Sequence, residues 1–136
     1  MKYYLTPLFA LLFVMQLRAA NFYDQLCEFN FNWKKYKTQA PKGEMNQFSS
    51  DKEYVFAHLS SVLNVIRTNP TAHLSAEQHD SRTHLIDVLD EYRIAKKFPV
   101  NSYRCARVPV FIDENHTHCA VAYLLQQTGY EELALS

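Results

Sequence analysis

Apolar residues recur every three or four positions along much of this chain, which is the spacing of amphipathic helices. The clearest stretch, residues 50–68, places Val55, Leu59, Val62 and Ile66 on one stripe. A Ser-x-x-Glu capping pattern begins the stretch and an Asn-Pro pair ends it, so the sequence marks both boundaries. We therefore predict a long amphipathic helix here.

A second capping box, Ser75 with Gln78, begins a helix that we predict over residues 76–96. Polar side chains such as Arg82 lie mostly off its apolar stripe. Two lysines close the helix, where cations suit the negative end of the helix dipole. The side chains expected to be buried are Leu85, Val88, Leu89, Tyr92 and Ala95.

Residues 21–38 are aromatic and polar by turns, and their spacing favours a helix over a short strand. We interpret Trp33 in this segment as a core residue. His58 lies beside the stripe of the 50–68 helix, where we expect a hydrogen-bonded helix residue rather than a ligand. Residues 39–49 carry no apolar period and predict a linker.

The C-terminal part predicts a short extended segment, residues 108–112, and then a helix over about 118–127. Pro109 would place the extended segment at an edge, and Asn115 or Thr117 could cap the helix. A last turn follows over 130–135. Only two glycines occur in 136 residues, which disfavours a turn-rich β fold. We predict an all-α protein, a small bundle of about four to five helices with one short extended segment before the last helices.

The N-terminus predicts export. Residues 1–20 combine Lys2, an apolar run and a small-residue end, as a signal peptide does, and residues 21–136 would form a single helical domain. Without Lys2 and Arg18 the mature chain has two more acidic than basic residues, so we predict that it does not bind nucleic acid. We expect a secreted or periplasmic protein with no membrane contact after signal cleavage.

Reactive side chains concentrate in residues 107–125. If the last main helix starts near residue 117, Cys119 lies in its first turn, where the helix dipole favours a thiolate. His118 or His116 could serve as the base and Asp113 could orient the imidazole. This grouping makes a thiol-dependent enzyme with Cys119 as nucleophile one hypothesis.

The same side chains allow two other interpretations. Asp113, His116, His118 and Cys119 all have metal-ligand chemistry, but paired ligand motifs are missing, so we predict no metal and no cofactor. A structural role is favoured instead. Arg107 could pair with Asp113, and in an oxidising compartment Cys105 could bridge to Cys119, with Cys27 to Cys119 as the alternative.

Several motifs in the second half of the chain resemble those of a family of uncharacterised exported bacterial proteins. The central one is similar to RxPxFxDxxGTxCAxxYL, and the residues here that correspond to it include Arg107, Pro109, Phe111, Asp113, Thr117, Cys119 and Tyr123. The resemblance implies a secreted, mainly helical bacterial protein and brings no activity with it. His116 stands where the family usually has glycine, and the family tends to continue beyond the position of Ser136, so the chain could lack a family activity or be a form used for binding.

We therefore expect a non-enzymatic binding protein, whose partner is an unknown protein or small ligand. The centre of its surface is expected at the corner formed by residues 113–123, packed against the first helix. The thiol-dependent enzyme is the first alternative, and a small metal-binding protein is the second.

Overall fold

The computed structural model describes residues 21–40, 48, 50–102 and 110–135. The predicted signal peptide lies outside the described residues, as do Cys105, Arg107 and Pro109. In the described part, the secondary structure consists of helices and one isolated antiparallel bridge between Ile112 and His118. The prediction of an all-α bundle is confirmed. No helix among the described residues is both long enough and apolar enough to cross a membrane.

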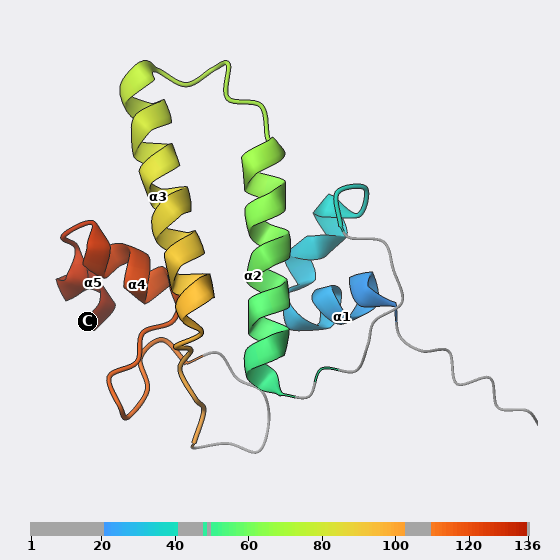
Figure 1. Ribbon diagram of the computed structural model, residues 1–136, viewed down its shortest axis with the longest axis vertical. Coiled ribbons are helices and arrows are strands. Elements are labelled where there is room, and N and C mark those ends of the chain that lie inside the picture. The colour runs from blue at the N-terminus through green and yellow to red at the C-terminus, as the bar shows by residue number, and fades with distance from the viewer. Residues whose placement is uncertain (1–20, 41–47, 49, 103–109, 136) are drawn as a thin grey trace, which may run out of the picture.

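Two long helices form the centre of the molecule (Figure 1). Helix α2 (Asp51–Thr68) and helix α3 (Ala76–Ala95) run antiparallel and lie side by side. Helix α1 (Phe22–Phe29) and the 3-10 helix η1 (Phe31–Tyr36) lie beyond α2, on one side of this pair. Helices α4 (Ala120–Gln127) and α5 (Glu131–Leu135) lie on the other side, next to α3.

The predicted caps begin both long helices. Ser50 Oγ accepts a hydrogen bond from the amide of Glu53 at 3.3 Å. Ser75 and Gln78 form the complete capping box, in which each side chain accepts from the other residue's amide. Helix α3 ends at Ala95, and its C-cap is Lys96, whose φ of 50° is left-handed. These local signals explain why the observed boundaries differ from the predicted ones by only one or two residues.

The N-terminal segment is helical, as predicted, but it is not one helix. Asn30 has extended backbone angles and ends α1, and its side chain accepts a hydrogen bond from the amide of Asn32 at 3.0 Å, which begins η1. Asparagine competes with helical backbone hydrogen bonds in this way. The break turns η1 so that Trp33 faces α2, where its side chain is 4% exposed.

Two apolar clusters pack against α2. The larger joins α2 to α3 and the segment that follows α3, and its buried members are Leu59, Leu63, Ile86, Leu89, Tyr92 and Phe98. The smaller joins α2 to α1 and η1 through Leu26, Trp33, Ala40 and Val65. Val62 of α2 packs against both clusters. Helix α2 is therefore the element on which both halves of the molecule are assembled.

Charged and aromatic side chains hold α2 and α3 in register. Asp90 of α3 accepts from Arg67 of α2 at 2.8 Å and from Arg93 of its own helix at 2.6 Å. The hydrogen bond from Arg67, and next that from Arg93, hold the pKa of the Asp90 carboxyl below its usual value. Phe56 of α2 lies between the cations of Arg93 and Lys96, at 4.7 and 4.5 Å from its ring centre.

Two predicted details were wrong. Helix α4 begins at Ala120 rather than near 118, and its cap is Cys119 rather than Asn115 or Thr117, because the backbone of residues 112–118 is taken up by the bridge between Ile112 and His118. On α3, Leu85 and Ala95 are exposed although we expected them to be buried, whereas Ile86 is buried. The buried face of α3 therefore includes Ile86 and leaves out Leu85 and Ala95.

Candidate functional site

The buried carboxylate of Asp113 organises the loop before α4. Its side-chain Oδ1 accepts from the amides of Asn115 at 2.9 Å and Thr117 at 2.8 Å, and Oδ2 accepts from the amide of Val100 at 3.0 Å. The Val100 amide, followed by that of Thr117, holds the pKa of this carboxyl below its usual value. Asp113 thus joins the chain that leaves α3 to the loop that enters α4.

Backbone hydrogen bonds close the same loop. The amide of Asp113 donates to the carbonyl of Thr117 at 3.1 Å, and the amide of Cys119 donates to the carbonyl of Phe111 at 2.8 Å. From α3, the hydroxyl of Tyr92 donates to the carbonyl of His118 at 2.9 Å. These contacts fix where α4 starts relative to α3.

The structure does not assemble the predicted catalytic group. Cys119 is the N-cap residue of α4, so it precedes the first turn, and its side chain makes no capping hydrogen bond. The Nε2 atom of His118 lies 3.9 Å from a carboxylate oxygen of Glu131 in α5 and has no hydrogen-bond partner among the described residues. His116 is exposed. Asp113 accepts from three backbone amides, and no hydrogen bond among the described residues joins Cys119 to either histidine.

The metal-binding alternative and the predicted disulfides concern the same side chains. Among the described residues, no three histidine, cysteine or acidic side chains gather closely enough to hold a metal. Cys27 and Cys119 carry free thiols, so the alternative bridge between them is not formed. The predicted pairings of Cys105 with Cys119 and of Arg107 with Asp113 each involve a residue outside the described part of the chain.

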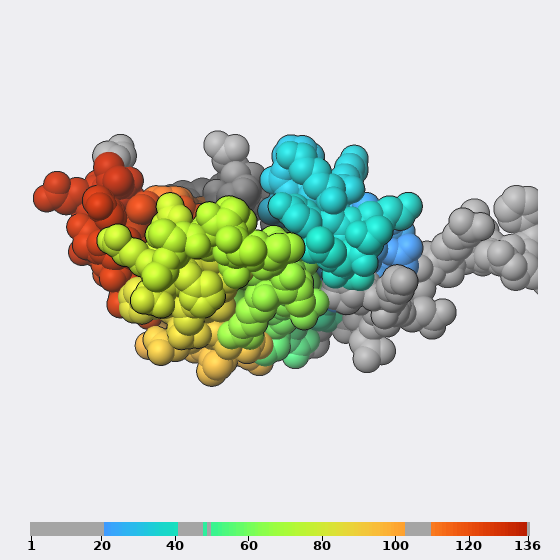
Figure 2. All heavy atoms as spheres, turned by 90° about the horizontal axis from the view of Figure 1, so that it is seen from above, coloured from blue at the N-terminus to red at the C-terminus, as the bar shows by residue number. Residues whose placement is uncertain are grey.

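The remaining motif residues that are described have packing or backbone roles. The ring of Tyr123 lies 5.1 Å from that of Tyr92 and packs against the larger core cluster. Thr117 donates its amide to Asp113, and Phe111 is 42% exposed. The corner they form was expected to pack against the first helix. Figures 1 and 2 show instead that the long helix pair separates the C-terminal helices from α1 and η1, so that expectation was wrong.

Replacing His116 with glycine is expected to stabilise the protein. His116 has a φ of 57°, a left-handed conformation that costs a side-chain-bearing residue about 1–2 kcal/mol. Glycine adopts it freely but loses about 0.5–1 kcal/mol through its more disordered unfolded state. We expect His116→Gly to raise the free energy of unfolding by about 0.5–1 kcal/mol in urea denaturation.

The matched control is His116→Ala, which removes the imidazole but keeps the strained Cβ and should give no gain. A loss of stability in His116→Gly would mean that the imidazole itself holds the loop together.

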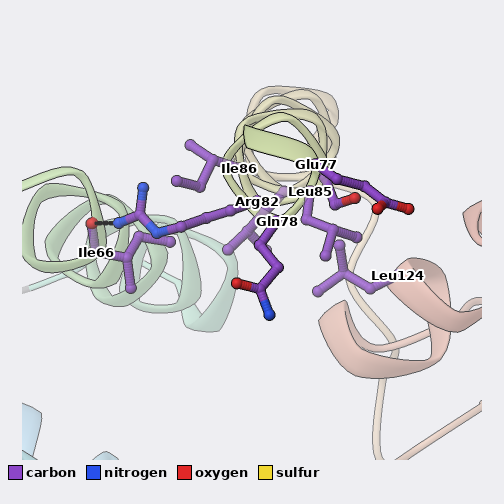
Figure 3. A pocket seen from close by; sticks show the side chains of 9 residues that line it. Ile66, Glu77, Gln78, Arg82, Leu85, Ile86 and Leu124 are labelled. Carbon is purple, nitrogen blue, oxygen red and sulfur yellow. Dashed lines mark hydrogen bonds between the residues drawn. The ribbon is translucent and has the colours of Figure 1, made fainter. Parts of the chain in front are cut away.

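A shallow groove that is open to solvent lies on α3, away from this loop (Figure 3). Its volume is about 630 Å³, within the range of small-molecule sites. Helix α3 forms its floor, Ile66 of α2 one wall and Leu124 of α4 the other. Leu85 faces Leu124 in this groove and is 36% exposed. The remaining lining residues are Glu77, Gln78, Ser81, Arg82, Ile86 and Leu89.

Arg82 is the cation of the groove. Its side chain crosses from α3 to α2, where a guanidinium N–H donates to the carbonyl of Ile66 in the last turn of that helix. Gln78 is held in the capping box through its side-chain oxygen, and Glu77 points away from Arg82, toward the α4 side. In the sequence, Arg82 lies off the apolar stripe of this helix, and we predicted no role for it. The feature of the sequence that could have indicated this site is the position of Arg82 one helical turn before Leu85.

Comparison with known proteins adds no assignment. The chain matches no protein-family model, no curated protein and no solved structure. The resemblance to exported bacterial proteins therefore stays a prediction. The function has to be argued from the loop of Asp113 and the groove themselves.

Proposed function

We propose that this is an exported, non-enzymatic binding protein whose ligand lies in the groove between α2, α3 and α4. The observation that carries the proposal is Leu85. It belongs to the apolar stripe of α3, yet it is left 36% exposed beside four other aliphatic side chains. Burying apolar surface is the main driving force of association. A ligand that covers Leu85 and its aliphatic neighbours would therefore gain binding free energy.

The loop of Asp113 has a supporting part in this proposal. Its hydrogen bonds to Val100, Asn115 and Thr117 fix the start of α4. Leu124, one turn further along α4, forms the groove wall. The loop residues that the sequence indicated as candidates for catalysis therefore support the groove, because they fix the position of the helix that forms its wall. No catalytic step is needed to explain their arrangement.

The groove should bind an apolar fluorescent probe, and Leu85→Glu should weaken that binding at least about tenfold, because the probe would have to cover a charged carboxylate where the wild-type protein offers it apolar surface. The measurement is fluorescence titration of the mature protein with N-phenyl-1-naphthylamine. The matched control is Ile94→Glu, which places the same carboxylate on the same helix, at a side chain that is 63% exposed and does not line the groove. Equal loss, or no loss, in the two variants would contradict the proposal.

A further inference from the structure

We propose that the ligand of the groove is a medium- or long-chain fatty acid, with its carboxylate bound by Arg82 and its alkyl chain lying along Leu85 toward Leu124. This inference rests on the proposed function and names the ligand class for the same site. It follows from the distribution of polar and apolar groups along the groove.

The cation is positioned and largely available. Arg82 is half-buried, and its hydrogen bond to the carbonyl of Ile66 is its single hydrogen bond among the described residues. A guanidinium has five N–H donors, so the contact that fixes its position leaves most of them for a ligand. Glu77, the acidic residue of the lining, points to the opposite side of α3. A carboxylate bound at Arg82 would therefore meet a cation without a competing anion beside it.

The rest of the lining suits an alkyl chain. Ile66, Leu85, Ile86, Leu89 and Leu124 provide branched aliphatic surface from three helices. An alkyl chain gains about 0.8 kcal/mol for each methylene group that it buries, and it has a single polar end to satisfy. One cation at the α2 side of the groove meets that requirement.

A peptide suits the same lining less well. Each peptide residue brings an N–H and a C=O that need partners when buried. Of the four polar lining residues, Glu77 points to the other side of α3 and the side-chain oxygen of Gln78 is already used in the capping box, so only Ser81 and Arg82 are left to pair with a peptide backbone. The described part of the chain also has no strand edge with which a peptide could pair. A ligand with one polar end is therefore favoured over a ligand with many.

Arg82 has a structural alternative role, since it satisfies a carbonyl in the last turn of α2, where cations are favoured. A purely structural Arg82 would affect stability but would not distinguish an acid from an alcohol. The test must therefore compare head groups on a common tail.

The experiment is isothermal titration of the mature protein with decanoate and with decanol at about pH 8, where the acid is ionised. Wild-type protein is expected to bind decanoate at least about tenfold more tightly than decanol, as charge-assisted hydrogen bonds imply. Arg82→Gln should remove this preference, and Arg82→Lys, which keeps the charge, should retain part of it. Thermal melts of the variants verify that they are folded.

The wild-type comparison decides the matter even if a variant fails to fold. Equal affinity for decanoate and decanol, or a preference that survives Arg82→Gln, would overturn the role of Arg82. Tighter binding of an acetylated trileucine peptide than of decanoate would overturn the ligand class. The proposed function would still stand in these cases, because it fails only if Leu85→Glu has no specific effect on probe binding.

Discussion

Acidification from about pH 6.5 to pH 4 is expected to cost this protein about 3 kcal/mol of stability through His58 alone. His58 of α2 is 8% exposed and lies between aromatic rings of the N-terminal segment. The indole N–H of Trp33 donates to its Nδ1 atom at 3.1 Å. That nitrogen must be unprotonated to accept, so the native contact requires the neutral imidazole.

The direction of the effect follows from the two states. Burial lowers the pKa of His58 from 6.5 to about 4 in the folded protein, whereas the unfolded chain takes up the proton near pH 6.5. Between these values the unfolded state binds more protons, so the free energy of unfolding falls as the pH falls. The contribution is complete above about pH 6.5 and is lost by about pH 4.

Urea denaturation at several pH values between about 4 and 7 measures this slope. The control is His58→Asn, whose amide oxygen can take the place of Nδ1 as acceptor for Trp33 but does not titrate. The variant should start less stable, because it leaves space among the rings, and should show a clearly flatter dependence on pH. An equal slope in both proteins would assign the acid sensitivity to other groups.

The second large effect is expected at Asp113. Asp113→Ala removes the acceptor of three backbone amides, those of Val100, Asn115 and Thr117, in a loop where the carboxylate is 7% exposed. Donors left without a partner are costly. We expect the midpoint of thermal unfolding to drop by roughly 5–15 °C, together with weaker probe binding, because the wall formed by α4 loses its anchor.

Asp80→Ala is the matched control, since Asp80 is a carboxylate on the exposed face of α3, with 88% of its side chain accessible, and its loss should leave the midpoint nearly unchanged.

The effects of pH on stability through Asp113 and through His58 are separable. Hydrogen bonds from backbone amides hold the pKa of Asp113 below its ordinary value of 3.8, so the stabilisation by this carboxylate is present above that pH and disappears only in more acidic solution, below the range in which His58 titrates. A midpoint unchanged in Asp113→Ala would show that the loop is held by other contacts.

Local signals in the sequence were sufficient for the helices. Ser50, Ser75 and Gln78 have capping chemistry that acts within one turn, and the Asn-Pro pair at 69–70 acts on its own neighbour, so the boundaries of α2 and α3 could be predicted. The pairing of Trp33 with His58 joins residues 25 positions apart. The sequence could indicate that Trp33 is a core residue and that His58 is a hydrogen-bonded helix residue, but not that the two meet.

The site depended on longer-range information. The grouping of Asp113, His116, His118 and Cys119 in sequence suggested shared chemistry, but the loop directs Asp113 to backbone amides and His118 toward Glu131. Neighbours in a turn point in different directions, so proximity along the chain was a poor guide. The groove could not be predicted because it exists only where α4 leaves part of α3 uncovered, and neither helix encodes that placement by itself.

The position of Val62 in both apolar clusters has a consequence for how the molecule opens. Separating α1 and η1 from α2 uncovers one side of a helix whose other side supports α3, whereas α4 and α5 contact the rest through α3 and the segment that follows it. Movement of α4 away from α3 would therefore widen the groove and admit a ligand while α2 and α3 stay paired.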